Sequence, residues 1–210
     1  MLKLLLSLLS LLLLACQSSP QPTAQSAYPS LDPLVAQVAQ SRDAQRAAAA
    51  QFEAVHEQLL QLPSCNYGDI QAVSAAVVAA HDDAVQAAVA MSTSIDAVQQ
   101  VADPLFQQWQ IEAAVYTDAR LKAASQAKLT LAWQNYTRLM QTLRQSAGQA
   151  DPVLADFNAA VEALQENPNA GDLAACKAVL NALADDIGVL VQQINSGIGQ
   201  SDAFIASAQQ

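Results

Sequence analysis

The sequence has little of several residue types, and each shortage excludes a class of protein. Aromatic residues make up only 5% of the 210 residues, and β-branched residues are also few, so a large β-sheet is not expected. There are 9 lysines and arginines against 19 aspartates and glutamates, and the net charge of −10 argues against non-specific nucleic-acid binding, which needs cations to neutralise phosphates. Because 52% of the residues are apolar, the chain is not globally disordered.

Residues that carry catalysis or bind metals are equally sparse. The chain has 2 histidines, and no serine or cysteine stands in a recognisable nucleophile motif. The 6 glycines form no phosphate-binding loop. The run His81-Asp82-Asp83 could ligate a metal weakly, although a solvated helix face is the simpler interpretation. We therefore expect a protein that is not an enzyme and that has no metal site and no cofactor.

The first 15 residues resemble a secretory signal peptide. One basic residue, Lys3, precedes an almost pure leucine run from Leu4 to Leu14, which is shorter than the roughly 20 residues that span a bilayer. The run ends in Leu-Leu-Ala-Cys16, which resembles a bacterial lipobox, so we expect cleavage before Cys16. The acyl and diacylglycerol chains on Cys16 would then anchor the protein in a membrane. An ordinary signal peptide with an incidental cysteine is the alternative.

The residue after this cysteine is Gln17 rather than aspartate. In the Gram-negative lipoproteins that this segment resembles, this implies sorting to the outer membrane, with the protein on the periplasmic face. Residues 16–30 are rich in proline, serine and glutamine, so they are expected to form a flexible tether that spans roughly 20 Å. Residues 31–208 are then the helical domain.

Residues 31–208 carry apolar residues that alternate three and four apart, which is typical of helices that pack side by side. Four such segments are separated by turns. The pattern predicts an all-α protein, an elongated antiparallel four-helix bundle with coiled-coil-like packing. In the second segment the predicted core positions include Ala84, Ala87, Met91, Ser94, Val98, Val101 and Leu105.

The second and third segments are the longest, at about 70 Å against about 45 Å and 50 Å for the other two. Because short turns force antiparallel neighbours, these two segments should project as a helical hairpin with its tip near Tyr116–Arg120. The first helix starts toward the same end, so we expect the tip to point toward the membrane. Asp103-Pro104 and Asp151-Pro152 each either cap a fresh helix or kink a continuous one, and the apolar pattern favours kinks or nearly straight breaks.

Two further cysteines, Cys65 and Cys176, fall at the same end of the predicted bundle. In the oxidising periplasm we expect a disulfide between them, which would close a loop of about a hundred residues. Two separate thiols, with Cys176 as a small core residue, are the alternative.

Charge is distributed unevenly along the chain. Residues 119–150 include five basic residues and no acidic one, whereas the rest of the mature chain has three basic residues against all 19 acidic ones. One interpretation is a basic strip for lipid headgroups or another anionic partner. The other is pairing across the hairpin, of Lys122 with Glu112 and of Arg138 with Asp96.

Aromatic residues cluster on the predicted hairpin at spacings that favour core packing. The alternative is a tip that touches the membrane interface, where tryptophan, tyrosine and basic residues are enriched. The candidate interaction strip consists of Trp109, Tyr116, Arg120, Lys122 and Lys128.

Several short stretches carry a family resemblance. They are Arg42-Asp43-Ala44-Gln45, Ile95-Asp96-Ala97-Val98, Leu105-Phe106 with Trp109, Pro152-Val153-Leu154 with Phe157, and Asp202-Ala203-Phe204-Ile205. With these, residues 41–205 resemble a family of uncharacterised gammaproteobacterial lipoproteins, known only as a domain of unknown function. Family members commonly have lysine and histidine where this chain has Gln165 and Glu166, so a role that depends on those groups is not expected here. The resemblance implies a helical periplasmic lipoprotein and supplies no activity.

Taken together, these patterns predict an outer-membrane-anchored periplasmic lipoprotein that acts as a non-enzymatic structural or partner-binding scaffold in the cell envelope. A module that binds lipid or envelope glycan through the basic and aromatic hairpin is the alternative. The expected partners are the membrane, through the anchor, and another envelope protein or a second copy of the chain.

Overall fold

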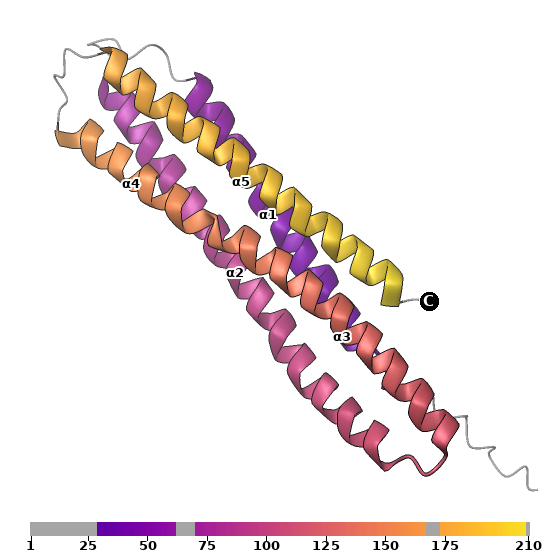
Figure 1. Ribbon diagram of the computed structural model, residues 1–210. Helices are drawn as coiled ribbons and strands as arrows, with labels where there is room; N and C mark the ends of the chain where they lie inside the picture. Colours follow the sequence, from indigo (N-terminus) through magenta and orange to yellow (C-terminus); the bar gives the residue numbers. More distant parts are fainter. Residues whose placement is uncertain (1–28, 62–69, 167–172, 209–210) are drawn as a thin grey trace, which may run out of the picture.

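The computed structural model describes residues 29–61, 70–166 and 173–208, and every regular element in these ranges is a helix. The helices lie side by side and form an elongated rod (Figure 1). Their bounds are α1 (Asp32–Gln61), α2 (Ile70–Val115), α3 (Ala119–Gly148), α4 (Ala150–Glu166) and α5 (Leu173–Ala208). The predicted all-α elongated bundle is confirmed.

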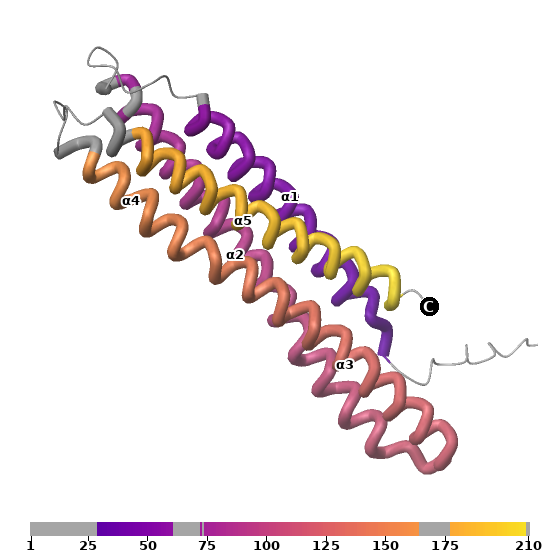
Figure 2. Tube along the Cα trace, turned by 45° about the horizontal axis from the view of Figure 1, so that its top comes forward, coloured from indigo at the N-terminus to yellow at the C-terminus, as the bar shows by residue number. Residues whose placement is uncertain are grey.

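The described helices make four rods, because α4 continues α3 along nearly the same line (Figures 1 and 2). In cross-section, α1 packs against α2 and α5, and the α3–α4 rod packs against the same two neighbours on the opposite side. Each rod is antiparallel to the next along the chain, and the start of α1 and the end of α5 lie toward the same end of the molecule. This is the predicted antiparallel four-rod arrangement.

The α2–α3 hairpin extends past the ends of α1 and α5. With 46 residues, α2 is about 69 Å long, whereas the 30 residues of α1 span about 45 Å. Asp118 caps α3 at the hairpin turn, where its side chain accepts hydrogen bonds from the backbone N–H groups of Arg120 and Leu121. The predicted projecting hairpin and the position of its tip are therefore confirmed.

The two Asp-Pro pairs behave differently. Pro104 lies inside α2, which continues through it as one helix. At the second pair the chain begins a fresh helix, but the break falls between Gly148 and Ala150, just before Asp151. Pro152 then lies in the first turn of α4, where a missing N–H group costs no intrahelical hydrogen bond.

The core follows the predicted spacing in most of the rod. In α1, the positions that the spacing predicts as core are buried even where the residue is polar, as at Ser41 and Gln45. The predicted core positions of the α3–α4 rod and of α5 that are buried are Ser125, Tyr136, Leu139, Leu143, Ser146, Ala150, Val153, Phe157, Ala160, Leu180, Leu183, Ile187, Leu190 and Ile194.

In α2 the predicted core positions are partly wrong. Ala87, Ser94, Val101 and Leu105 are only half-buried, and the neighbouring residues Ala88, Ile95, Ala102 and Phe106 are buried instead. The physical reason is that the buried positions of α2 recur about every 3.6 residues, as in a straight helix, whereas the prediction followed the 3.5-residue repeat of a supercoiled one. The two repeats agree near Val77 and Ala84 and drift apart further along the helix, where several buried positions lie one residue beyond the predicted ones.

A layer of small and polar residues crosses the middle of the bundle. The hydroxyl groups of Ser41 and Ser94 lie 3.1 Å apart, and the Gln45 amide nitrogen donates to the Ser41 carbonyl at 3.2 Å. The Ser146 hydroxyl, on α3, lies 2.8 Å from the Gln193 carbonyl of α5 and donates to it. Gly197 is buried in the same layer, so α1 and α5 approach closely there.

Candidate functional site

Two of the three cysteines lie outside the described residues. These are Cys16, the predicted lipidation site, and Cys65, the first cysteine of the predicted disulfide. The second, Cys176, falls in the first turns of α5, but its side chain is not among those described. Lipidation and the disulfide therefore stay predictions.

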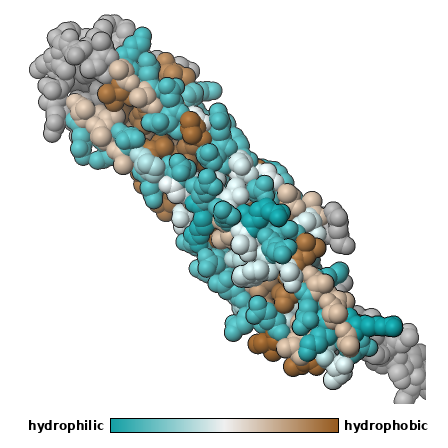
Figure 3. All heavy atoms as spheres, viewed as in Figure 1, coloured by the Kyte–Doolittle hydropathy of each residue, from teal (hydrophilic) through white to brown (hydrophobic). Residues whose placement is uncertain are grey.

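The tip of the α2–α3 hairpin exposes large apolar side chains. Val115 is 72% exposed, Ile111 54% and Leu121 47%. Figure 3 shows hydrophobic residues at this end of the rod and at other places along it. Beyond the ends of α1 and α5 the described part of the hairpin is only two helices thick, so no other described helix packs against these side chains. We call Ile111, Val115 and Leu121 the apolar tip.

Basic side chains flank the apolar tip. The Lys122 amine donates to the Ala114 carbonyl at 3.0 Å and makes no ion pair with Glu112, which instead accepts from the Gln108 amide at 2.8 Å. Arg120, Lys122 and Arg138 form no ion pair with any residue that the structure describes. The tip therefore carries Arg120 and Lys122 together with the acidic Glu112 and Asp118, and none of the four is held in an ion pair within the described residues.

The predicted pair of Arg138 with Asp96 is also wrong. Asp96 accepts a hydrogen bond from Arg144 at 2.6 Å, and the same guanidinium reaches Gln99 at 2.9 Å. A long side chain on a helix leans toward the N-terminus of that helix, so Arg144 reaches a carboxylate about a turn nearer the tip than its own Cα. The prediction matched backbone positions and did not include this lean.

The aromatic residues of the hairpin are mainly core residues. Trp109 is buried, and its indole N–H donates to the Ser125 hydroxyl at 3.0 Å. Phe106 packs edge-on against Trp133, with ring centroids 5.0 Å apart, and also contacts Tyr136. Burial, and next the nearby charge of Asp103, raises the pKa of Tyr136 to about 12. Trp109 is therefore not part of an exposed strip.

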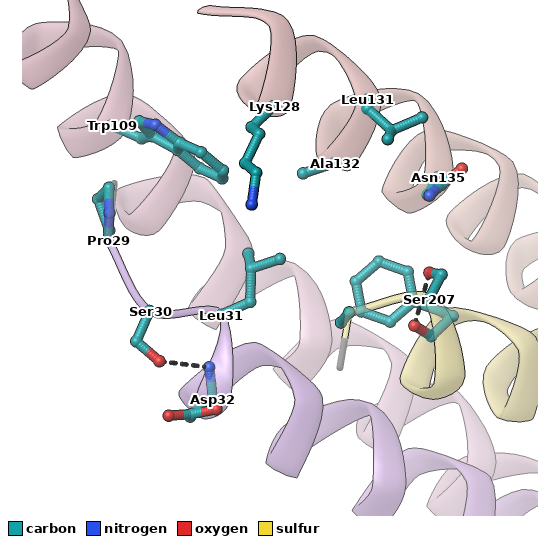
Figure 4. Close-up of a pocket in the computed structure, with 12 residues that line it drawn as sticks. Pro29, Ser30, Leu31, Asp32, Trp109, Lys128, Leu131, Ala132, Asn135 and Ser207 are labelled. Atoms are coloured by element: carbon teal, nitrogen blue, oxygen red, sulfur yellow. Dashed lines mark hydrogen bonds between the residues drawn. The ribbon is translucent and has the colours of Figure 1, made fainter. Parts of the chain in front are cut away.

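A cavity of about 590 Å³ opens at the base of the hairpin (Figure 4). It forms where α1 begins and α5 ends while α2 and α3 continue, so the hairpin loses two packing partners at that level. Lys128 extends from α3 into this space, and Trp109 and Leu31 flank it. The lining residues are Pro29, Ser30, Leu31, Asp32, Trp109, Lys128, Leu131, Ala132, Asn135, Phe204, Ser207 and Ala208.

The sequence did not reveal this cavity, because its walls come from the two ends of the domain and from the middle of the chain. The signals were Trp109 and Lys128, which both belonged to the candidate interaction strip and both line the cavity. Leu131 stands outside the predicted core positions and is 58% exposed, which in hindsight marks the rim.

The two histidines face different neighbours. His56 lies beside Gly188 of α5, and His81 packs edge-on against Phe157 of α4 with ring centroids 5.5 Å apart. Within the described ranges, no three histidine, cysteine or carboxylate side chains come together in a way that could hold a metal ion. A search of the same residues finds no helix apolar and long enough to cross a membrane.

Comparisons with known proteins place the chain in a family. No curated protein and no solved structure matches it. A family model described as protein of unknown function (DUF2959) matches residues 25–208, which include all five described helices. Since the match covers most of its length, this helical chain belongs to the uncharacterised DUF2959 family.

Proposed function

We propose that the protein is a non-enzymatic scaffold, held by a lipid on Cys16 at the periplasmic face of the outer membrane, that binds another envelope protein through the apolar tip. The signal-peptide and lipobox patterns of residues 1–16 support the anchor. The sparse catalytic residues and the long buried hydrophobic core of the rod support a structural role.

The observation that carries this proposal is the position of the apolar tip. Val115 and Ile111 are more than half exposed at the projecting end of the rod. Exposed apolar side chains that gather at one place mark interaction sites, whereas single ones need no explanation. A two-helix hairpin that projects from a four-rod body also presents these side chains without hindrance from α1 or α5.

Site-specific photo-crosslinking in cells tests the proposal. A photoreactive residue at Val115 should give a crosslinked adduct with one envelope protein that survives purification. The matched control is Val89, which is 60% exposed on the same helix but about 39 Å from Val115 along its axis. Adducts of equal yield at both positions, or none at Val115, would overturn the proposal.

A second candidate function is contact between the apolar tip and the anchoring membrane. Val115 lies six residues beyond Trp109, or about 9 Å along α2, and Trp109 shares the cavity with Pro29. The predicted tether between Cys16 and Pro29 spans roughly 20 Å, so the anchor and the tip can reach the same plane. Apolar side chains beside Arg120 and Lys122 suit the boundary of an anionic membrane.

Flotation with anionic vesicles separates the two functions. An unacylated form that floats with vesicles, and that stops floating when Arg120 and Lys122 are both changed to glutamate, supports membrane contact. If the unacylated form fails to float, and the Val115 adduct still forms in cells, binding to an envelope protein is the function that remains.

A further inference from the structure

We propose that the cavity at the base of the hairpin binds a single acyl chain of an anionic amphiphile, such as a fatty acid. The inference does not require the lipid anchor or the apolar tip to act as proposed above. It concerns the space enclosed by the start of α1, the end of α5 and the hairpin (Figure 4).

The size and the lining of the cavity fit such a ligand. Its volume of about 590 Å³ lies within the range of ligand pockets, which are mostly apolar with a few placed polar groups. Apolar walls come from Trp109 on α2, from Leu31 just before α1, and from Phe204 near the end of α5. An acyl chain suits this site because it is narrow, apolar and without hydrogen-bonding groups of its own.

The polar groups of the cavity select the head of the ligand. The Lys128 side chain projects into the space, and the Asn135 amide lies farther along the same helix (Figure 4). Asp32 also lines the cavity but belongs to the start of α1, on the other side. An amine and an amide on one wall favour an anionic head that lies against α3, with the acyl chain running toward Phe204 and Leu31.

Fluorescence quenching of Trp109 tests the inference. The chain from Gln17 onward contains every described core residue, from Leu34 to Phe204, and this unacylated form is used. The chain has 2 tryptophans, and W133F makes Trp109 the only one. The probe is stearic acid with bromine on its chain, kept below its micelle-forming concentration, because bromine quenches tryptophan only at contact. We expect saturable quenching, and its absence would overturn the inference.

A filled cavity provides the matched control. In the W133F chain, Ala132→Phe puts a ring into the space, whereas Ala123→Phe puts the same ring on an exposed position of the same helix, half a turn around it. Binding should be lost in the first variant and kept in the second. Equal quenching in both variants would show that the probe adheres elsewhere, and the inference would fail.

Two further variants keep the test sound if Ala132→Phe does not fold. Leu131→Asp changes an exposed rim residue and should weaken fatty-acid binding. Lys128→Gln should raise the Kd of the fatty acid about two- to fivefold, the effect of one exposed charge pair, and leave binding of a long-chain alcohol unchanged. An equal loss for acid and alcohol would refute the assigned head position.

The length of the ligand gives an independent readout. In competition with the brominated probe, the affinity of unbrominated fatty acids should rise about fourfold for each added methylene until the cavity is filled, and then level off. A rise that continues without a plateau indicates adsorption to an open surface and counts against the cavity.

Discussion

Replacing Gly197 by alanine tests how closely α1 and α5 pack at the polar layer. A Cβ atom at this position would lie 2.6 Å from the side-chain oxygen of Gln45, closer than real Cβ contacts come. It would also lie 3.3 Å from the Ser146 hydroxyl and 3.4 Å from Leu143. Gln45 is fully buried and its amide nitrogen donates to the Ser41 carbonyl, so moving this side chain costs packing or that hydrogen bond.

The cost follows from these contacts. Overpacking a core or turning the Gln45 amide away from Ser41 costs about 2 kcal/mol, and the better helix propensity of alanine returns about 1 kcal/mol. We therefore expect Gly197→Ala to lower the free energy of unfolding by about 1 kcal/mol. Among the residues that the structure describes, the Gln45 oxygen has no hydrogen-bond partner, so the added methyl breaks no bond to that atom.

Gly199 provides the matched control. A Cβ atom there meets nothing within 4 Å, so Gly199→Ala should raise the free energy of unfolding by about 0.5–1 kcal/mol. Urea unfolding followed by circular dichroism measures both variants under the same conditions. If Gly197→Ala is as stable as Gly199→Ala, α1 and α5 are not in contact as described.

A double-mutant cycle locates the clash. In a Gln45→Ala background the added methyl group at position 197 has room, so Gly197→Ala should then be neutral or stabilising. The coupling free energy between the two positions should be about 1–2 kcal/mol. A coupling near zero would mean that the cost arises elsewhere in the polar layer.

Three other measurements test separate parts of the structure. Because the pKa of Tyr136 is raised from 10.0 to about 12, its contribution to stability is full below pH 10 and is lost as the pH rises to about 12; Tyr136→Phe should flatten this loss in unfolding experiments, and an unchanged pH profile would contradict it. A double-mutant cycle of Asp96→Ala with Arg144→Ala should give a coupling free energy of no more than about 1 kcal/mol, because both side chains are about half exposed. A larger coupling would mean that the pair is shielded from water. A thiol count on the denatured, unreduced protein should find Cys65 and Cys176 oxidised, and two free thiols would end the disulfide prediction.

Spacing alone predicted much of the fold. Ser41, Gln45 and Ser146 are polar, yet their place in the three-and-four pattern marked them as core positions, and all three are buried. The pattern succeeded because a helix turns its residues by a fixed angle, so a position on the buried stripe is buried whatever its side chain. Ala88 and Ile95 were missed because the buried stripe of α2 keeps the 3.6-residue repeat of a straight helix, which drifts away from the 3.5-residue repeat that was assumed.

The remaining features depend on three-dimensional placement. The break at Gly148 had a local signal, since glycine is a poor helix former, but the Asp-Pro pair beside it was the stronger one. The ion pair of Arg144 required knowing how far a side chain leans along its helix. The cavity required knowing that the start of α1 and the end of α5 stop at one level, which no pattern within a single segment can give.

The lengthwise placement of α1 between α2 and α5 determines how the rod responds to force. A pull at Asp32, directed away from the body along the axis, loads the two flanking interfaces in shear, so that many side chains resist together. The same pull directed sideways would peel the first turn away and separate the contacts one after another. The protein should therefore withstand axial tension on its N-terminal segment far better than tension across the rod.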